Sequence, residues 1–214
     1  MKSHERKLII IGLYTLVLGA ILGLVAVLLV SNLPSAQQTA QWAKVVSAKP
    51  YTISYYLLMY AYLIPIMGFW AIHRLFSAEK TPYLLSFWGM ILSILGSALP
   101  MASIGVSAFA YPAIARMFLS HGLDVASLTK DMFPSNAMVF LLFSGLYYLA
   151  GIVLFGIVLW KHPGPLLKIA SISLILHGLL IILPDLVLVN LLSWIFLLAS
   201  SVLLIIYARH LPGQ

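Results

Sequence analysis

The 214-residue chain contains no cysteine and very few charged side chains. Without cysteine, it offers no disulfide, thiolate metal site, CxxC redox pair or cysteine nucleophile. Charged residues make up 8% of the chain and hydrophobic residues 63%, whereas soluble domains are about 25% charged and about 45 to 50% apolar. A water-facing surface needs more polar side chains than this. The composition therefore excludes a soluble globular protein and indicates a protein embedded in a bilayer.

The sequence also lacks the short motifs of common enzymes. It contains no HExxH, GxSxG, GKS or GKT segment, the signatures of zinc proteases, serine hydrolases and P-loop nucleotide sites. No acidic side chain falls within a long apolar run, which disfavours pumps and ion-coupled transporters. His73 and His177 belong at different depths of the membrane, so they cannot hold one haem between them. We therefore expect no metal and no cofactor.

Long apolar runs occupy most of the chain. A membrane helix needs about 20 mostly apolar residues, and the sequence contains six such runs between its charges and its proline or glycine clusters. The runs are residues 8–31, 51–76, 83–108, 137–160, 166–183 and 186–208. The sequence predicts an all-α, polytopic six-helix bundle that forms a single transmembrane domain over residues 1–214.

The cations divide unequally between the two sides of such a bundle. Six crossings put both termini on one side, and the cations on that side are Lys2, Arg6, Lys7, Arg74, Lys80, Lys161, Lys168 and Arg209. Those on the other side are Lys44, Lys49, Arg116 and Lys130. Since cytoplasmic loops are rich in Lys and Arg, we expect a cell-membrane protein with both termini in the cytoplasm. The net charge of +7 then reports topology, and the expected partner is the lipid bilayer rather than nucleic acid.

Two connections on the outer side, residues 32–50 and 111–136, are long enough to carry structure. In the first, Ser35 and Gln38 have the spacing of a capping box, and we expect a short surface helix through Trp42 to Val46. The second connection is expected to continue the third run and to turn near His121.

Small residues four positions apart mark one face on each of two predicted helices. Small side chains at this spacing allow close approach between membrane helices. We expect both faces to pack inside the bundle, with a homodimer through one of them as the alternative. The residues are Thr15, Gly19 and Gly23 in the first run and Gly89, Ser93 and Ser97 in the third.

Two prolines, Pro65 and Pro100, lie inside the second and third runs. Each removes a backbone donor and crowds the carbonyl four residues earlier, so both helices are expected to kink. Kinked helices create binding sites in transporters, but prolines are also frequent in membrane helices that have no such role.

His177 is the only ionisable residue well inside a predicted span. Polar groups in hydrocarbon are costly, which makes each one a candidate functional group, and desolvation favours the neutral imidazole. One interpretation is a polar pocket in the outer half that binds a small ligand or relays protons. The other is a buried histidine that joins helices through hydrogen bonds. The other candidate members are Asn190, Ser193, Tyr60, Ser144, Tyr147 and Tyr148.

These patterns do not identify a specific function. We expect a non-enzymatic accessory or interaction protein, which should have a packed interior and an apolar surface patch. The first alternative is a small transporter or binding protein for an apolar or amphipathic molecule, with a cavity that reaches His177. A membrane-embedded enzyme with unrecognised chemistry is the second alternative, and it should bring two or more titratable groups within hydrogen-bond reach.

Overall fold

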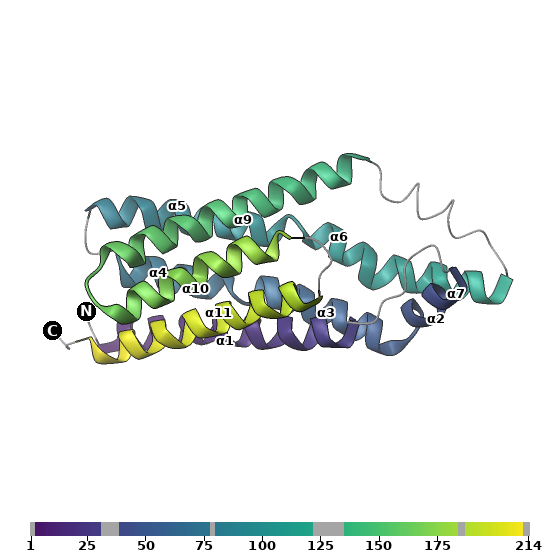
Figure 1. Cartoon of the computed structure of the whole chain (residues 1–214), viewed down its shortest axis with the longest axis horizontal. Helices are drawn as coiled ribbons and strands as arrows, with labels where there is room; N and C mark the ends of the chain where they lie inside the picture. The colour runs from purple at the N-terminus through teal and green to yellow at the C-terminus, as the bar shows by residue number, and fades with distance from the viewer. Residues whose placement is uncertain (1–2, 31–38, 78–79, 122–134, 184–186, 212–214) are drawn as a thin grey trace.

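The computed structural model describes residues 3–30, 39–77, 80–121, 135–183 and 187–211, which form a bundle of helices (Figure 1). Five stretches are long and apolar enough to cross a membrane: His4–Val30, Lys49–Leu75, Pro82–His121, Leu141–Lys161 and Val187–His210. The predicted all-helical bundle with membrane-type helices is confirmed. Six spanning helices are not, because the fifth predicted run forms a shorter helix, Pro165–Ile181, of 17 residues.

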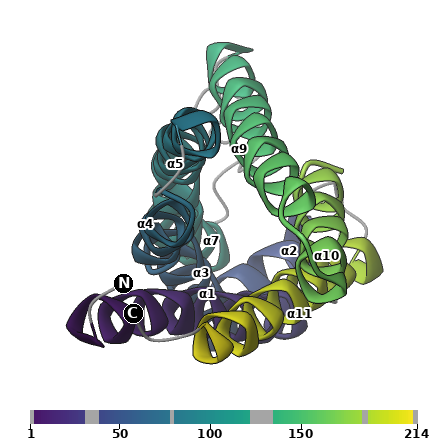
Figure 2. The same cartoon turned by 90° about the vertical axis from the view of Figure 1, so that its left-hand side faces the viewer.

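The helices pack as a ring that follows their order in the chain. They are α1 (Ser3–Val30), α2 (Thr39–Val46), α3 (Lys49–Leu63), α4 (Ile66–Leu75), α5 (Lys80–Ala98), α6 (Met101–Gly105), the π-helical turn η1 (Val106–Ala110), α7 (Tyr111–His121), α9 (Ser135–Lys161), α10 (Pro165–Ile181) and α11 (Val187–His210). α1 contacts α3 and α4, α4 contacts α5, α5 contacts α9, α10 lies between α9 and α11, and α11 returns to α1. Figure 2 shows this ring end-on, in a view along the length of the bundle. Both chain ends lie at one end of the bundle, which we call the terminal end, and the opposite end is the cap end (Figure 1).

Two of the membrane stretches are interrupted at prolines. The helix breaks between α3 and α4 at Pro65 and between α5 and α6 at Pro100. Since Pro100 has no N–H, the carbonyl of Gly96 lacks its helical donor, and it accepts the Ser144 hydroxyl of α9 at 2.9 Å instead. A break in one helix is thus compensated by a side chain from its neighbour.

The third membrane stretch is longer than a bilayer requires. The sequence predicts a run over 83–108 that the following connection continues, and the helical path does continue to His121, through the π-helical turn in which the Tyr111 N–H bonds to the Val106 carbonyl. Pro112 then falls in the first turn of α7, where a missing N–H is tolerated. The 40-residue stretch is about 60 Å long at 1.5 Å per residue, against a hydrocarbon layer of about 30 Å. Its last part therefore projects beyond the cap end of the bundle (Figure 1).

A second, smaller core holds this projecting part together. The short helix expected through Trp42 to Val46 is α2, which packs against α7, whereas the expected capping box at Ser35 lies outside the described residues. The Trp42 and Tyr111 rings meet edge to face at 5.9 Å. We call α2, α7 and the first turns of α3 the cap. Its buried residues are Trp42, Ala43, Val46, Tyr51, Ile114 and Ala115.

The two faces of small residues lie between helices of the same chain. A Cβ added to Gly19 would lie 2.4 Å from Cγ of Pro65, and one added to Gly23 would lie 2.3 Å from the ring of Trp194. On α5, a Cβ on Gly89 would lie 3.2 Å from the Gly151 carbonyl oxygen of α9. The other members behave differently: the Thr15 hydroxyl bonds within its own helix, and Ser93 and Ser97 are buried. The glycines on both faces are therefore occupied by contacts inside the ring.

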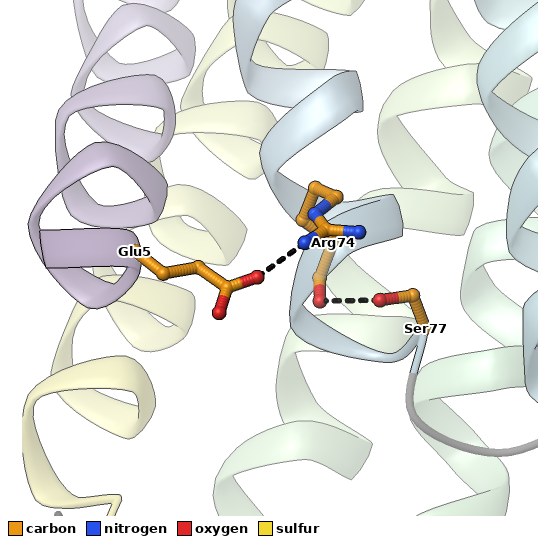
Figure 3. Close-up of polar contacts among 3 residues, drawn as sticks. All are labelled: Glu5, Arg74 and Ser77. Carbon is orange, nitrogen blue, oxygen red and sulfur yellow. Dashed lines mark hydrogen bonds and ion pairs between the residues drawn. The ribbon is translucent and has the colours of Figure 1, made fainter. Parts of the chain in front are cut away.

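Charged side chains connect the helices at the terminal end. Arg74 of α4 forms an ion pair with Glu5 of α1, and the Ser77 hydroxyl donates to the Arg74 carbonyl at 3.0 Å (Figure 3). The Arg6 Nε–H donates to the Ala208 carbonyl of α11 at 3.0 Å. Neighbouring cations of α1 and α4 thus tie three helices together at this end.

Candidate functional site

Aromatic rings fill the axis of the helix ring. Phe69 of α4 stacks on Phe155 of α9, with ring centroids 6.0 Å apart, and its other neighbour is the Tyr148 ring, also at 6.0 Å. The series continues from Tyr148 to His177 at 5.7 Å and from His177 to Trp194 at 5.5 Å. All five side chains are buried. This column of rings connects α4, α9, α10 and α11 across the inside of the helix ring.

His177 lies within this column and makes hydrogen bonds through both ring nitrogens. Its Nδ1 is 3.0 Å from the carbonyl oxygen and 2.9 Å from the hydroxyl oxygen of Ser193 on α11. A carbonyl can only accept, so Nδ1 carries the proton, and Nε2 accepts the Tyr148 hydroxyl proton at 2.9 Å. The Ser193 hydroxyl donates back to the His177 carbonyl at 3.1 Å. A neutral imidazole is fully paired by this arrangement, which joins α9, α10 and α11.

The structure brings together some of the predicted site residues and separates others. His177, Ser193 and Tyr148 form one network, and Ser144 lies one turn from Tyr148 on α9. Tyr60 lies outside this cluster, since its side chain is 57% exposed. Asn190 is half-buried but forms no hydrogen bond with His177. Tyr147 is 39% exposed and also points away from the axis.

A partly open cavity of about 170 Å³ lies beside this network, towards the cap end. It is bounded by α3, by the break around Pro100, and by the cap-end portions of α9 and α10. Ser144 and Tyr148 border it, whereas His177 does not, because the Tyr148 side chain stands between them. Further lining residues are Tyr62, Gly96, Leu141 and Ile182.

Most polar groups at the cavity already form hydrogen bonds within the protein. The Ser144 hydroxyl donates to the Gly96 carbonyl, and the Tyr148 hydroxyl donates to His177. Tyr62 is different: its ring contacts Tyr148 at 6.4 Å, but its hydroxyl forms no hydrogen bond with any residue that the structure describes. The cavity can therefore offer a bound molecule an apolar wall and one free phenolic hydroxyl. The sequence argument missed Tyr62, although the residue is two positions from Tyr60.

The other buried histidine network lies at the terminal end. Nδ1 of His73 is 2.9 Å from the Ser86 hydroxyl, which itself donates to the Tyr83 carbonyl at 3.0 Å. Since the serine proton is used on that carbonyl, Nδ1 of His73 is the donor in the first contact. This pair joins α4 to α5. Within the described residues, no group of three or more His, Cys, Asp or Glu side chains is placed to hold a metal ion.

Comparison with known proteins adds no further information about this site. No protein-family model, curated protein or solved structure matches the chain.

Proposed function

We propose that this chain is a non-enzymatic accessory or interaction protein of a cell membrane. The observation that carries this proposal is that the buried histidines are hydrogen-bonded to neighbouring helices. The buried His177 is paired at both ring nitrogens, His73 is bonded to Ser86, and the axis is filled by stacked rings. Tyr148 and His177 are two titratable groups in contact, but the Tyr148 hydroxyl and Nε2 of His177 are hydrogen-bonded to each other. His177 is also 0% exposed. These hydrogen bonds hold helices together, and His177 has no ring nitrogen left free for acid–base chemistry.

The proposed topology has six crossings and cytoplasmic termini. α9 and α11 both run towards the terminal end, so α10 must carry the chain back to the cap end (Figure 1). Its 17 residues are at the lower limit for a span, about 25 Å at 1.5 Å per residue. The reversal from α9 into α10 uses Gly164 at φ 118°, a conformation that favours glycine. The excess of Lys and Arg in the segments at the terminal end supports placing that end in the cytoplasm.

The cap is the surface that we propose for interaction. Met117 and Leu119 of α7 are 50% and 47% exposed on the stretch that projects past the hydrocarbon. The described part of the cap also exposes Lys44, Lys49 and Arg116 and contains no acidic side chain. Apolar side chains that project into water beside cations favour a partner with an apolar and acidic surface.

A photocrosslinking amino acid at Met117 tests this proposal in the native membrane. The matched control carries it at Ile169 of α10, which is 52% exposed on the side of the bundle. We expect a discrete protein adduct from position 117 that is reduced by Arg116→Glu and by raised salt, and only lipid adducts from position 169. The absence of a protein adduct at 117, or the same adduct from both positions, would contradict the interaction role.

A second candidate function is the binding of an apolar or amphipathic small molecule. The cavity beside Ser144 and Tyr148 favours it. The filled axis favours binding over transport, because a transported molecule would have to displace the column of rings.

A further inference from the structure

The cavity exists because three neighbouring elements leave space at the same level. Pro100 interrupts the helix on one side, and α10 ends at Ile181 while α9 continues towards the cap end. Gly145 of α9 also borders the cavity, and a Cβ added there would meet only Ile182, at 3.3 Å. Most other glycines of the bundle are blocked by atoms nearer than 3.0 Å. The space is thus a product of the backbone rather than of one flexible side chain.

The position of the cavity determines the surroundings of a bound ligand. At 1.5 Å per residue, Tyr148 lies about 20 Å and Leu141 about 30 Å along α9 from Lys161. Lys161 marks the terminal end of α9, and the hydrocarbon layer is about 30 Å thick. The cavity therefore lies in the third of the hydrocarbon nearest the cap. A molecule bound at this depth is surrounded by hydrocarbon and must itself be lipophilic.

The size and lining of the cavity define the class of ligand. Enclosed apolar cavities of about 150 Å³ bind benzene-sized molecules, and this partly open one, of about 170 Å³, has room for a fragment of similar size. Ser144 and Tyr148 have already used their protons inside the protein, which leaves the Tyr62 hydroxyl as the group available to a ligand. Tyr62 is half-buried, and a ligand oxygen that pairs with its hydroxyl would gain a hydrogen bond where the surrounding hydrocarbon offers none.

We infer that this cavity is a binding site for a lipophilic molecule whose bound portion is a short chain or ring of about six heavy atoms with one hydroxyl or carbonyl oxygen. The apolar portion fills the space between α9, α10 and the Pro100 break. The oxygen pairs with Tyr62. The inference rests on the second candidate function above and is independent of the partner proposed for the cap.

Photolabelling of the purified protein in lipid vesicles tests the inference. The probe is an octanol that carries a diazirine, and its sites of attachment are mapped by mass spectrometry. We expect labelling of the segments around Leu141, Gly145 and Ile182 that excess octanol blocks. Leu141→Trp should lower it at least fivefold by filling the cavity. Leu142→Trp is the matched control on the exposed side of the same helix, where the native side chain is 58% exposed, and it should leave labelling unchanged.

Two further measurements separate the elements of the inference. Tyr62→Phe should weaken binding of the octanol probe about fivefold, which corresponds to one hydrogen bond, and should leave binding of the matched diazirine octane unaffected.

A phosphatidylcholine with a diazirine near its chain end distinguishes the two sources of ligand. Labelling at the same residues identifies a bilayer lipid as an occupant, and labelling by octanol alone identifies a free lipophile. Unsaturable labelling spread over the lipid-facing surface, equal in Leu141→Trp and Leu142→Trp proteins that elute as monodisperse species, would overturn the inference. Neither the presence nor the absence of a protein adduct at Met117 alters this result.

Discussion

The half of the bundle near the termini and the half near the cap are built differently. Near the termini, α1 is tied to α4 by Glu5 and Arg74 and to α11 by Arg6, and the axis contains the stacked rings of Phe69 and Phe155. Near the cap, the Pro100 break occurs and the cavity opens beside the paired His177. The half near the termini is closely packed, whereas the half near the cap contains the cavity for which we propose ligand binding.

The two halves also differ in how backbone groups are paired. α5 and α9 pack closely at Gly151, where a Cβ would lie 2.5 Å from the Ser93 backbone nitrogen, and at Gly89, where a Cβ would lie 3.2 Å from the Gly151 carbonyl oxygen. Further along the same two helices, the Pro100 break leaves the Gly96 carbonyl to be paired by the Ser144 hydroxyl. In lipid every unpaired backbone group is costly, so irregular backbone persists only where a neighbour supplies a donor. One pair of helices can therefore combine tight packing with an irregular site.

The largest difference between the halves should appear when large side chains are removed. Phe155→Ala deletes a ring that is 0% exposed and stacked on Phe69, and it should lower the free energy of unfolding by about 3 to 5 kcal/mol. Leu141→Ala enlarges a cavity that already exists and should cost less than about 1.5 kcal/mol. Reversible unfolding in mixed micelles measures both. Equal losses would mean that the two halves are packed alike.

Adding a methyl group to a glycine of α9 should change stability by different amounts in the two halves, and this difference should be smaller than the one for the large side chains. Gly151→Ala places a Cβ 2.5 Å from the Ser93 backbone nitrogen, which cannot move as a side chain can, and should cost about 1 to 3 kcal/mol. Gly145→Ala, on the cavity side, should change stability by less than about 0.5 kcal/mol. The same micelle assay applies, and a reversed order of the two variants would be evidence against the cavity.

Removing one hydrogen bond of the His177 network should have a smaller effect. Tyr148→Phe leaves Nε2 without its donor, and hydrogen bonds between membrane helices contribute about 0.6 kcal/mol on average and up to about 1.7. The double mutant with Ser193→Ala should show coupling, because both side chains orient the same imidazole. Strict additivity of the two single changes would show that the network does not act as a unit.

The smallest effect is expected at the ion pair of the terminal end. Glu5 and Arg74 are 34% and 41% exposed, and pairs of this exposure contribute about 0.2 to 1 kcal/mol. Glu5→Gln should therefore lower stability slightly in dilute buffer and by less in 1 M salt, where screening has already weakened the pair. Arg209→Gln removes a contact to Tyr14 but no ion pair, so it is the control for any effect of salt on stability that does not involve the ion pair. A loss that grows with salt would contradict a Coulombic contribution.

The sequence predicts the helices well because hydropathy and length decide them in lipid. It also predicts that Ser193 returns to the depth of His177, and the two side chains do form a hydrogen bond. It does not predict how each helix is rotated. α3 is apolar on most of its surface, and Tyr60 and Tyr62 differ by about 200° around the helix. Only packing decides that Tyr62 borders the cavity and Tyr60 is exposed.

The sequence predicts the helices of the cap but not the contact between them. The sequence suggests that the third run continues, but a proline at position 112 would ordinarily end a helix. The π-helical turn before it places Pro112 in a first turn, and the contact of α7 with α2 stabilises the extension. That contact joins residues far apart in the chain, such as Trp42 and Tyr111, and no local pattern reports it.

The difference between the two halves is tested most directly by solving the structure of the protein under xenon pressure. Xenon enters dry apolar cavities and does not displace close-packed rings. The account predicts one ordered xenon between Ser144, Tyr148 and Ile182, and none along the axis between Phe69 and Phe155. Xenon found on that axis, or no xenon beside Ser144, would contradict it.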